Sequence, residues 1–328
     1  MEEVMDKISQ LLLSKYGLNE LSIQFLRHNE NRTYRVNDCG GASYLLRIHQ
    51  PFKESMIGLQ HSYEGLLVEM DMLEELSRQT NLTSQKPLRT LDGQLVTMLE
   101  HEGKWLNATM LTWLEGRDLN KDDVANPERV LALGRHLSEL HAFFHLYPKG
   151  QLDKRPSQDV AYHTKIVDTV QRGLELGLFQ ASDIDTIKST IDLINSRLEQ
   201  TGNDGFGLIH GDISMGNTLI TNDGDIAIID YGFFGTGYYL LDVAMGAMMI
   251  PAELRDTFLE GYYGREREQV TEYDIVLMEG FMIVAIIGYY AFQMGNTSVH
   301  DWMRDRMPKL CRNYCRPFLN SERIFYTC

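Results

Sequence analysis

Three polar residues in the stretch from Leu208 to Ala244 are spaced as group-transfer chemistry would require. Asp212 and Asn217 lie five positions apart in one predicted loop, and Asp230 follows an apolar run that reads as a buried strand. A phosphoryl group in transfer needs a carboxylate that orients the attacking hydroxyl and accepts its proton, and oxygen ligands that hold Mg²⁺ against the phosphates. We predict the first task for Asp212 and the second for Asn217 and Asp230.

The elements that must position these residues fall into two groups. Before Gly116 the pattern indicates a small antiparallel sheet with one inserted helix. Helical spacing covers residues 4–16 and 65–79, and β-leaning runs cover 21–26, 33–36, 43–48, 94–99 and 105–114. After Gly116 the chain reads as mostly helical, over residues 127–144, 164–176, 181–200 and from 240 onward, with short strands at 208–209, 218–220 and 226–229. The sequence therefore predicts an α+β protein with domains at 1–114 and 115–328.

The motif H-G-D-x-x-x-x-N from His210 to Asn217, followed by I-I-D-Y-G, resembles the aminoglycoside phosphotransferase and choline kinase family, whose fold is that of the protein kinases. The resemblance implies two lobes: a small N-terminal lobe with an antiparallel sheet and a mainly helical C-terminal lobe. It implies that Asp212 is the catalytic base and that Asn217 and Asp230 bind Mg²⁺. It also implies that Asp242 braces the catalytic loop, with His210 in support.

In the predicted small lobe, the strand Y-L-L-R-I resembles the one that presents a basic side chain to the α- and β-phosphates, which here is Arg47. Glu69 resembles the helix carboxylate that pairs with it, with Glu64 and Glu74 as rival carboxylates. Arg47 stands where the wider family most often has Lys, and the two side chains differ in reach and donor geometry. This departure leaves open a catalytically inert nucleotide-binding protein of the same fold.

Two further parts of the small lobe are implied by the resemblance. Thr112 and Leu114 resemble the hinge whose backbone meets the adenine edge. The run Asn29-Glu30-Asn31-Arg32 stands where the family places its phosphate-covering loop, although it lacks the G-x-G-x-x-G of protein kinases. The implied cofactors are ATP, with GTP possible, and Mg²⁺.

The acceptor is predicted to be a small-molecule hydroxyl. Gly211 replaces the Arg of the protein-kinase H-R-D, and only a short stretch without A-P-E separates Asp230 from Asp242. A Ser/Thr protein kinase of the same fold is the remaining alternative. Residues 116–259 hold 21 acidic and 12 basic residues, which favours a cationic acceptor such as an aminoglycoside, an amino alcohol or a homoserine-like compound. The candidate acidic contacts are Glu253, Asp256 and Glu260.

Composition and motifs exclude several other classes. The 328 residues carry a net charge of −15, which argues against a nucleic-acid partner. The apolar run 280–292 is too short to span a bilayer, and the first residues lack a signal-peptide pattern, so we predict a cytoplasmic protein with no membrane partner. His136, His141 and His145 share a helix without H-E-x-x-H and read as helix packing, and Cys311 and Cys315 read as packing rather than a metal site. No P-loop or G-x-S-x-G occurs. The sequence carries no signal for the oligomeric state.

Overall fold

The structure is a computed structural model that describes residues 2–28, 30–51, 58–148, 150, 152–201 and 205–327. The chain forms two compact units, and each is assembled from three separate segments. Unit 1 comprises Met1–Arg117, Tyr147–Pro156 and Ile220–Phe233, and unit 2 comprises Asp118–Leu146, Ser157–Leu219 and Phe234–Cys328. The first segment of unit 1 ends close to the predicted boundary at 114, but the unit also includes two later segments.

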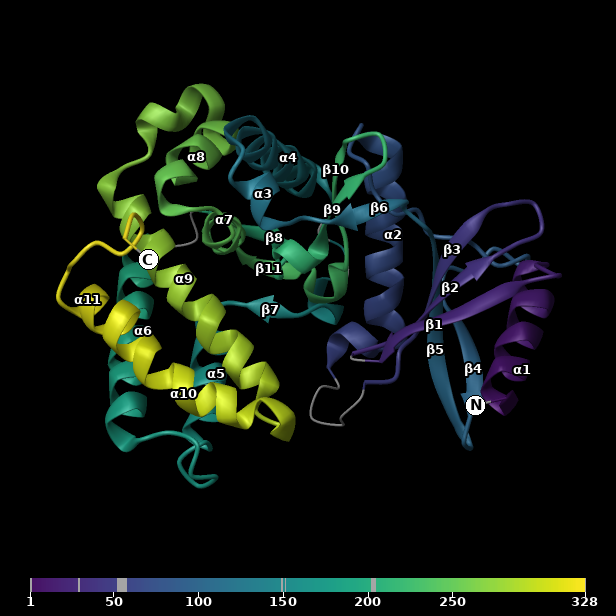
Figure 1. The fold of residues 1–328 in the computed structure, drawn as a ribbon, viewed down its shortest axis with the longest axis horizontal. Coiled ribbons are helices and arrows are strands. Elements are labelled where there is room, and N and C mark those ends of the chain that lie inside the picture. Colours follow the sequence, from purple (N-terminus) through teal and green to yellow (C-terminus); the bar gives the residue numbers. More distant parts are fainter. Residues whose placement is uncertain are drawn as a thin grey trace. The chain divides into compact units, whose positions relative to one another are not determined.

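Unit 1 is built on a five-stranded antiparallel sheet in the order β1-β2-β3-β5-β4. The strands are β1 (Ser22–His28), β2 (Arg32–Asn37), β3 (Ser43–Ile48), β4 (Thr97–His101) and β5 (Lys104–Thr112). Helix α1 (Glu2–Leu11) lies against this sheet at β4 (Figure 1). Apolar side chains of α1 and of alternate strand positions form one buried cluster, which includes Ile8, Val36, Leu46 and Met110. This cluster anchors the sheet that carries Arg47.

Helix α2 (Tyr63–Gln79) supplies the second layer of unit 1. Its N-terminus is capped by Ser62, whose hydroxyl accepts a hydrogen bond from the Gly65 backbone N–H at 3.0 Å. The buried face of the helix is mostly apolar, with Leu66 and Leu73 almost fully enclosed, yet Glu69 lies on it with 1% of its surface exposed. A carboxylate this deep in a core requires charged partners. The helix therefore positions Glu69 for an ion pair.

The other strands of the described residues form two small sheets. One has the order β10-β9-β6, formed by β6 (Gly116–Asp118), β9 (Thr218–Thr221) and β10 (Ile226–Ile228). The other, in unit 2, has the order β7-β11-β8, formed by β7 (Ser157–Gln158), β8 (Phe206–Ile209) and β11 (Gly235–Tyr238). Strands β6, β7 and β11 are two to four residues long and were not predicted, because such short runs carry no clear periodicity.

The rest of unit 2 is helical. Its α-helices are α3 (Lys121–Val124), α4 (Pro127–Leu146), α5 (Val160–Gln171), α6 (Ala181–Thr201), α7 (Tyr239–Met248), α8 (Arg255–Tyr263), α9 (Glu272–Gln293), α10 (His300–Leu310) and α11 (Arg316–Leu319). Helix α9 packs against α5, α6 and α7 and forms the centre of this unit (Figure 1). The predicted α+β class, with an antiparallel sheet followed by a mainly helical part, is confirmed.

Helix α9 also corrects one expectation about its length. The sequence suggested an apolar run of 13 residues, whereas the helix has 22 and is long and apolar enough, by length and composition, to cross a membrane. The run was underestimated because Glu272, Asp274 and Glu279 interrupt the first part of the helix. Of the most apolar 18-residue stretch of α9, 61% is buried within the protein, as expected for the core helix of a globular unit.

One helix begins earlier than its apolar pattern suggests. Periodicity predicts a helix over 164–176, but α5 starts at Val160, because the Asp159 side chain accepts a hydrogen bond from the Tyr162 N–H at 3.0 Å and caps it there. The helix ends at Gln171, and turns follow up to Gly177, which has a φ of +64°. This shift brings Tyr162 and His163 into the helix.

Candidate active site

The loop after β8 is held in place by a single buried carboxylate. Asp242, on α7, is fully enclosed, and its two oxygens accept hydrogen bonds from the backbone N–H groups of His210 (2.7 Å) and Gly211 (2.9 Å). Gly211 has a φ of +78°, a conformation that suits glycine, and its carbonyl accepts a hydrogen bond from Gln158 Nε2 at 3.1 Å. The backbone that precedes Asp212 is thus held by hydrogen bonds to Asp242 and from Gln158.

His141 is a further partner of Asp242 that the sequence pattern did not reveal. Its Nε2 lies 3.1 Å from Asp242 Oδ2, and its Nδ1 lies 2.7 Å from the hydroxyl of Tyr262. Because a carboxylate only accepts, Nε2 carries a proton and donates it to Asp242, while Nδ1 forms a hydrogen bond with the Tyr262 hydroxyl. His141 was expected to serve helix packing alone. Its spacing to His145 suggested no contact with a residue a hundred positions away.

Asp212 and Asn217 meet within the same loop. Asn217 Nδ2 donates to the carboxylate Oδ2 of Asp212 at 2.7 Å and to the Asp212 backbone carbonyl at 2.9 Å. The Asp212 N–H donates to Nδ1 of His210 at 3.2 Å, and His210 is fully buried. The structure therefore brings together the four residues that the sequence singled out in this half of the site: Asp212, Asn217, His210 and Asp242.

Tyr162 lies close enough to Asp212 for the two to interact electrostatically. Burial, followed by the negative charge of Asp212, raises the pKa of Tyr162 to about 12. Its hydroxyl also faces Gly288 on α9, where a Cβ would approach it to 2.8 Å. Tyr162 is therefore a neutral hydroxyl at neutral pH. It was not predicted as a site residue.

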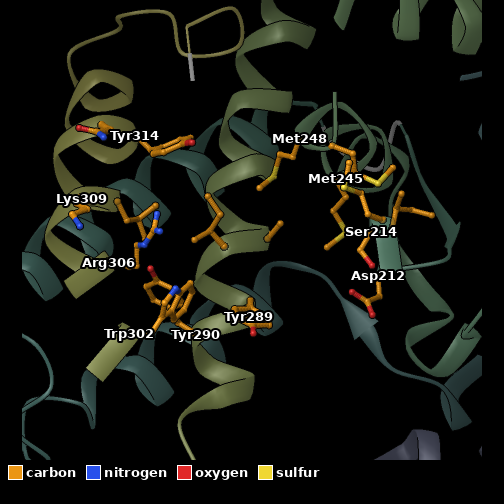
Figure 2. A pocket seen from close by; sticks show the side chains of 17 residues that line it. Asp212, Ser214, Met245, Met248, Tyr289, Tyr290, Trp302, Arg306, Lys309 and Tyr314 are labelled. Carbon is orange, nitrogen blue, oxygen red and sulfur yellow. The ribbon is translucent and has the colours of Figure 1, made fainter. Parts of the chain in front are cut away.

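A pocket of about 620 Å³ in unit 2 includes Asp212 in its lining (Figure 2). The loop contributes Asp212 and Ser214, and α7 and α9 contribute mainly apolar and aromatic side chains. The remaining wall comes from α10 and the turn that follows it. The full lining is Asp212, Ile213, Ser214, Met215, Met245, Met248, Met249, Ala285, Ile286, Tyr289, Tyr290, Trp302, Arg306, Lys309, Leu310, Asn313 and Tyr314. None of Glu253, Asp256 and Glu260 belongs to it.

In unit 1, Arg47 and Glu69 form a buried ion pair. Arg47 Nη2 lies 2.6 Å from Glu69 Oε1, and Arg47 Nε donates to Thr109 Oγ1 at 3.3 Å. Burial alone would lower the pKa of Arg47, but the carboxylates of Glu69, Asp230 and Glu30 outweigh it and raise that pKa. Both partners stay charged. The rival carboxylate Glu74 pairs instead with Arg89 at the surface.

A second arginine, which the sequence did not predict, binds the other oxygen of Glu69. Arg155 is 2% exposed; its Nη1 lies 3.4 Å from Glu69 Oε2 and donates to the Gly65 carbonyl at 3.1 Å. Its Nη2 donates to the carbonyls of Tyr231 (2.8 Å) and Gly232 (2.7 Å). The pKa of Glu69 is lowered, because the two guanidinium groups outweigh the opposing effect of burial. Nothing in the pattern Lys-Arg-Pro marked this residue.

Asp230 follows β10 after one intervening residue and has an unusual backbone. Its φ is +65°, in the left-handed region that non-glycine residues rarely occupy. Its carboxylate lies 3.2 Å from Arg27 Nη2 and 3.9 Å from Arg47 Nη1. Strained backbone of this kind persists where the surrounding structure holds it, often at functional sites. Here the hydrogen bonds from Arg155 to the carbonyls of Tyr231 and Gly232 hold the backbone that follows Asp230.

The remaining predicted residues of the small lobe differ in how their polar groups are used. Thr112 donates its N–H to the Lys86 carbonyl at 2.8 Å, and its own carbonyl accepts from Gln85 at 3.3 Å. Leu114 has no backbone hydrogen bond within the described part of the chain. Asn31 Oδ1 is enclosed and accepts no hydrogen bond from the described residues. Asn29, the first residue of the predicted covering loop, lies outside the described residues.

Asn217 and Asp230 each carry a side-chain oxygen of the kind that binds Mg²⁺. Because Asn217 Nδ2 is directed at Asp212, its amide oxygen is left as an acceptor. Asp230 adds a carboxylate in unit 1. Among the described residues no group of three His, Cys, Asp or Glu side chains could hold a metal. Mg²⁺ commonly takes only one or two protein ligands and fills its other positions with water and substrate phosphates, so the amide oxygen of Asn217 in unit 2 and the carboxylate of Asp230 in unit 1 are each suited to be such a ligand.

Residues 22–274 match the sequence profile of the phosphotransferase enzyme family. The chain belongs to this family. The resemblance to the aminoglycoside phosphotransferase and choline kinase family is thereby confirmed, and the chain is an enzyme, a small-molecule phosphotransferase. A search of curated proteins by sequence finds no match.

Solved structures show the same fold. The chain is similar to a microcompartment-associated aminopropanol kinase, with 21% identity, a TM-score of 0.76, and coverage of 97% of this chain and 98% of the other. It is similar to an amicoumacin kinase in complex with AMP-PNP and Ca²⁺, at 18% identity, TM-score 0.71, and coverage of 95% and 96%. An ethanolamine kinase of Plasmodium vivax follows, at 17% identity, TM-score 0.66, and coverage of 98% and 90%. The protein-kinase-like fold predicted for this family is confirmed.

Proposed function

We propose that this phosphotransferase transfers the γ-phosphate of ATP, with Mg²⁺ bound, to the hydroxyl of a small molecule. The observation that carries the proposal is the position of Asp212: it is fixed by a braced loop and lines a pocket of about 620 Å³. A pocket of this volume matches a small-molecule ligand. We place the activity in the cytoplasm, as the sequence predicts.

Asp212 is the proposed base. Its carboxylate would accept the proton of the acceptor hydroxyl as that oxygen bonds to the γ-phosphorus, while the bond from phosphorus to the β–γ bridging oxygen breaks and ADP leaves. The hydrogen bond from Asn217 fixes the orientation of the carboxylate. His210, Asp242 and His141 support the loop without touching the reacting atoms.

Unit 1 is the proposed nucleotide side, in keeping with a nucleotide-binding lobe at residues 1–114. Arg47, held by Glu69, would meet the α- and β-phosphates, and Asn31 would face them from the loop before β2. Thr112 has both backbone groups engaged, so the adenine edge is assigned to the backbone of Leu114. A planar guanidinium can donate to two phosphate oxygens at once, which makes Arg47 a workable substitute for Lys.

Asn217 and Asp230 are the residues that would hold Mg²⁺. The ion, when bound, neutralises charge on the transferring phosphates. Asn217 contributes its amide oxygen, since its nitrogen is engaged by Asp212. Asp230 contributes a carboxylate whose backbone is held by Arg155 through the following carbonyls.

The acceptor is proposed to be an alcohol that carries an amine, as the acidic middle segment suggested. Two proteins of the same fold are named as kinases of amino alcohols, aminopropanol and ethanolamine. The faces of Tyr289 and Trp302 in the pocket could receive an ammonium group. Aminoglycosides and homoserine-like compounds are the other predicted acceptors and are tested beside the amino alcohols.

ADP release tests the proposal. The purified protein is incubated with ATP and Mg²⁺ and a panel of amino alcohols, homoserine and aminoglycosides, and Asp212→Asn serves as the catalytic control. We expect at least one acceptor to raise ADP release, and the Asp212→Asn variant to lower kcat by about a thousandfold. Asp225→Asn, at a surface turn of a different loop, should leave the rate unchanged.

Other outcomes would favour the alternatives. If nucleotide binds but no acceptor raises ADP above the Asp212→Asn level, the protein is a nucleotide-binding member of the fold without this activity. If labelled phosphate passes to a protein but to none of the small molecules, the Ser/Thr protein kinase reading is favoured. A parallel series with GTP in place of ATP determines the nucleotide preference.

A further inference from the structure

The charges that line the pocket beside Asp212 are not those of a site built for a cation alone. Of its lining residues, Asp212, Arg306 and Lys309 carry charge, so two of the three are basic. Asp212 is the proposed base and is committed to the hydroxyl. Among the residues that the structure describes, no other carboxylate lines the pocket, although the segment 116–259 is acidic as a whole.

Both basic residues come from one face of α10. Trp302, Arg306 and Lys309 follow at helical spacing, and Asn313 continues the same face through the π-helical turn Cys311–Cys315. Figure 2 shows Arg306 and Lys309 on one side of the pocket and Asp212 and Ser214 on the other. A molecule whose hydroxyl reaches Asp212 can therefore extend its other end toward α10.

Arg306 and Lys309 differ in whether a carboxylate of the protein forms an ion pair with them. Lys309 lies 2.6 Å from Asp305 on its own helix, so part of its charge is used there. Arg306 forms no ion pair with a carboxylate of the described residues, whereas its neighbour Arg304 pairs with Asp301 at 2.5 Å. Asp305 is near enough to interact with Arg306 electrostatically but forms its ion pair with Lys309. A guanidinium that is charged, lines a pocket and has no carboxylate of the described residues at ion-pair distance is suited to bind one from a ligand.

We propose that the acceptor carries, besides its hydroxyl, a carboxylate or phosphate that binds Arg306, with Lys309 adding to the local positive potential. The inference rests on the proposed function and narrows its acceptor class to anionic or zwitterionic alcohols. An amine on the same molecule remains compatible, since Tyr289 and Trp302 form an aromatic wall next to Arg306. A homoserine-like compound meets all three requirements, while a plain amino alcohol leaves Arg306 unused.

The test uses pairs of probes that differ in the anionic group alone. Homoserine is compared with 3-aminopropan-1-ol, serine with ethanolamine, and 4-(hydroxymethyl)benzoate with 4-methylbenzyl alcohol; a phosphate arm compares 3-hydroxypropyl phosphate with propan-1-ol. Binding of each probe to the full-length protein is measured by calorimetry, and ADP release is followed separately. The variants are Arg306→Gln and, as a matched control on the same helix, Arg304→Gln, whose side chain is outside the pocket lining.

We expect at least one anionic probe to bind about tenfold tighter than its uncharged or decarboxylated partner, and Arg306→Gln to remove that difference. Arg304→Gln should preserve it. With an acceptor that is turned over, Arg306→Gln should raise KM and leave kcat within about twofold. Equal binding within every pair, or a preference that survives in Arg306→Gln, would overturn the inference.

The two proposals fail in different measurements. If anionic probes bind through Arg306 but none supports ADP release above Asp212→Asn, the anion site stands and the proposed reaction fails. If ADP release is seen with amino alcohols, but the unaltered protein binds both members of every pair equally or Arg306→Gln keeps its preference for the anionic member, the reaction stands and the anion site is wrong. Tighter binding of 3-hydroxypropyl phosphate than of homoserine would assign the site to phosphate rather than carboxylate.

Discussion

The proposed site residues of unit 1 and those of unit 2 are each held in place by a different kind of interaction. In unit 2, the loop that carries Asp212 depends on hydrogen bonds from backbone N–H groups to Asp242, with His141 as a third donor. In unit 1, Glu69 is paired with two guanidinium groups, Arg47 and Arg155, in an almost fully buried cluster. The residues of unit 2 are organised by neutral donors around an anion, and those of unit 1 by opposite charges.

Asp212 in unit 2 and Arg47 in unit 1 are therefore held in place in two different ways. The hydrogen bonds to Asp242 fix the conformation of a short loop, and the loop in turn fixes the position of the Asp212 carboxylate. The charge cluster instead joins a strand, a helix and two later segments, and each charge depends on the others to stay ionised away from water. We expect the charge cluster to suffer more than the loop when one member loses its charge.

The largest effect is expected from Glu69→Gln. The change leaves two buried guanidinium groups without a carboxylate, and removing one partner of such a cluster costs about 3–5 kcal/mol. Unfolding in guanidinium chloride, followed by circular dichroism, measures the loss. Glu74→Gln, which breaks a surface pair on the same helix, is the control and should change little. A loss in Glu69→Gln no larger than in this control would mean that the charge cluster adds nothing to stability.

Asp242→Asn should come next. The amide keeps one acceptor, but its NH₂ group would face a backbone N–H of the loop, which leaves buried donors unsatisfied at a cost of about 2–3 kcal/mol. The free energy of unfolding and kcat should fall together, because the loop also carries Asp212. The matched control is Asp256→Asn, whose carboxylate lies at the surface next to Arg267. Unchanged stability in Asp242→Asn would show that the loop holds its shape without this brace.

A smaller effect is expected at Asp230, where the backbone carries the strain. Glycine adopts a φ of +65° without the steric cost that a Cβ brings, so Asp230→Gly should be more stable than Asp230→Ala by about 1 kcal/mol. Both variants lose the same carboxylate and should lose activity alike. Thermal or denaturant unfolding of the pair measures the difference. Equal stability of the two variants would contradict the strain.

The smallest effect concerns pH and His49. Burial, and then the positive charge of Arg47, lowers the pKa of His49 well below its ordinary value. Since the unfolded chain takes up a proton near pH 6.5 and the folded protein does not, stability is lost as pH falls below that value, by at most about 1.4 kcal/mol per pH unit. His49→Gln should reduce the difference in unfolding free energy between pH 7.5 and pH 5.5 by about 1 kcal/mol. An unchanged difference would exclude His49 as a source of acid sensitivity.

The sequence predicted the loop of unit 2 better than the charge cluster of unit 1. Asp212, Asn217 and Asp242 lie within about thirty residues, and their order in a recognisable motif carries the information. Arg47 and Glu69 were predicted through the same resemblance. Arg155 was missed, because its partners lie 86 and 76 positions away and a single Arg before Pro has no periodic signature.

The role of His141 was missed for the same reason. His141 reaches Asp242 from a helix more than a hundred residues earlier, so its role follows from packing and not from spacing. The basic face of α10 was missed for another reason. The net charge of a long segment says little about the few side chains that line one pocket.

The segment Tyr147–Pro156 has a consequence for anyone who cuts or recombines this chain. Arg155 lies there, and it connects the helix that carries Glu69 with the residues that follow Asp230, so all three stretches of unit 1 meet at one guanidinium. An expression fragment that stops at residue 114 would leave Glu69 with one partner instead of two and would lack Asp230. A chimera that exchanges this unit between relatives must transplant three stretches of sequence together.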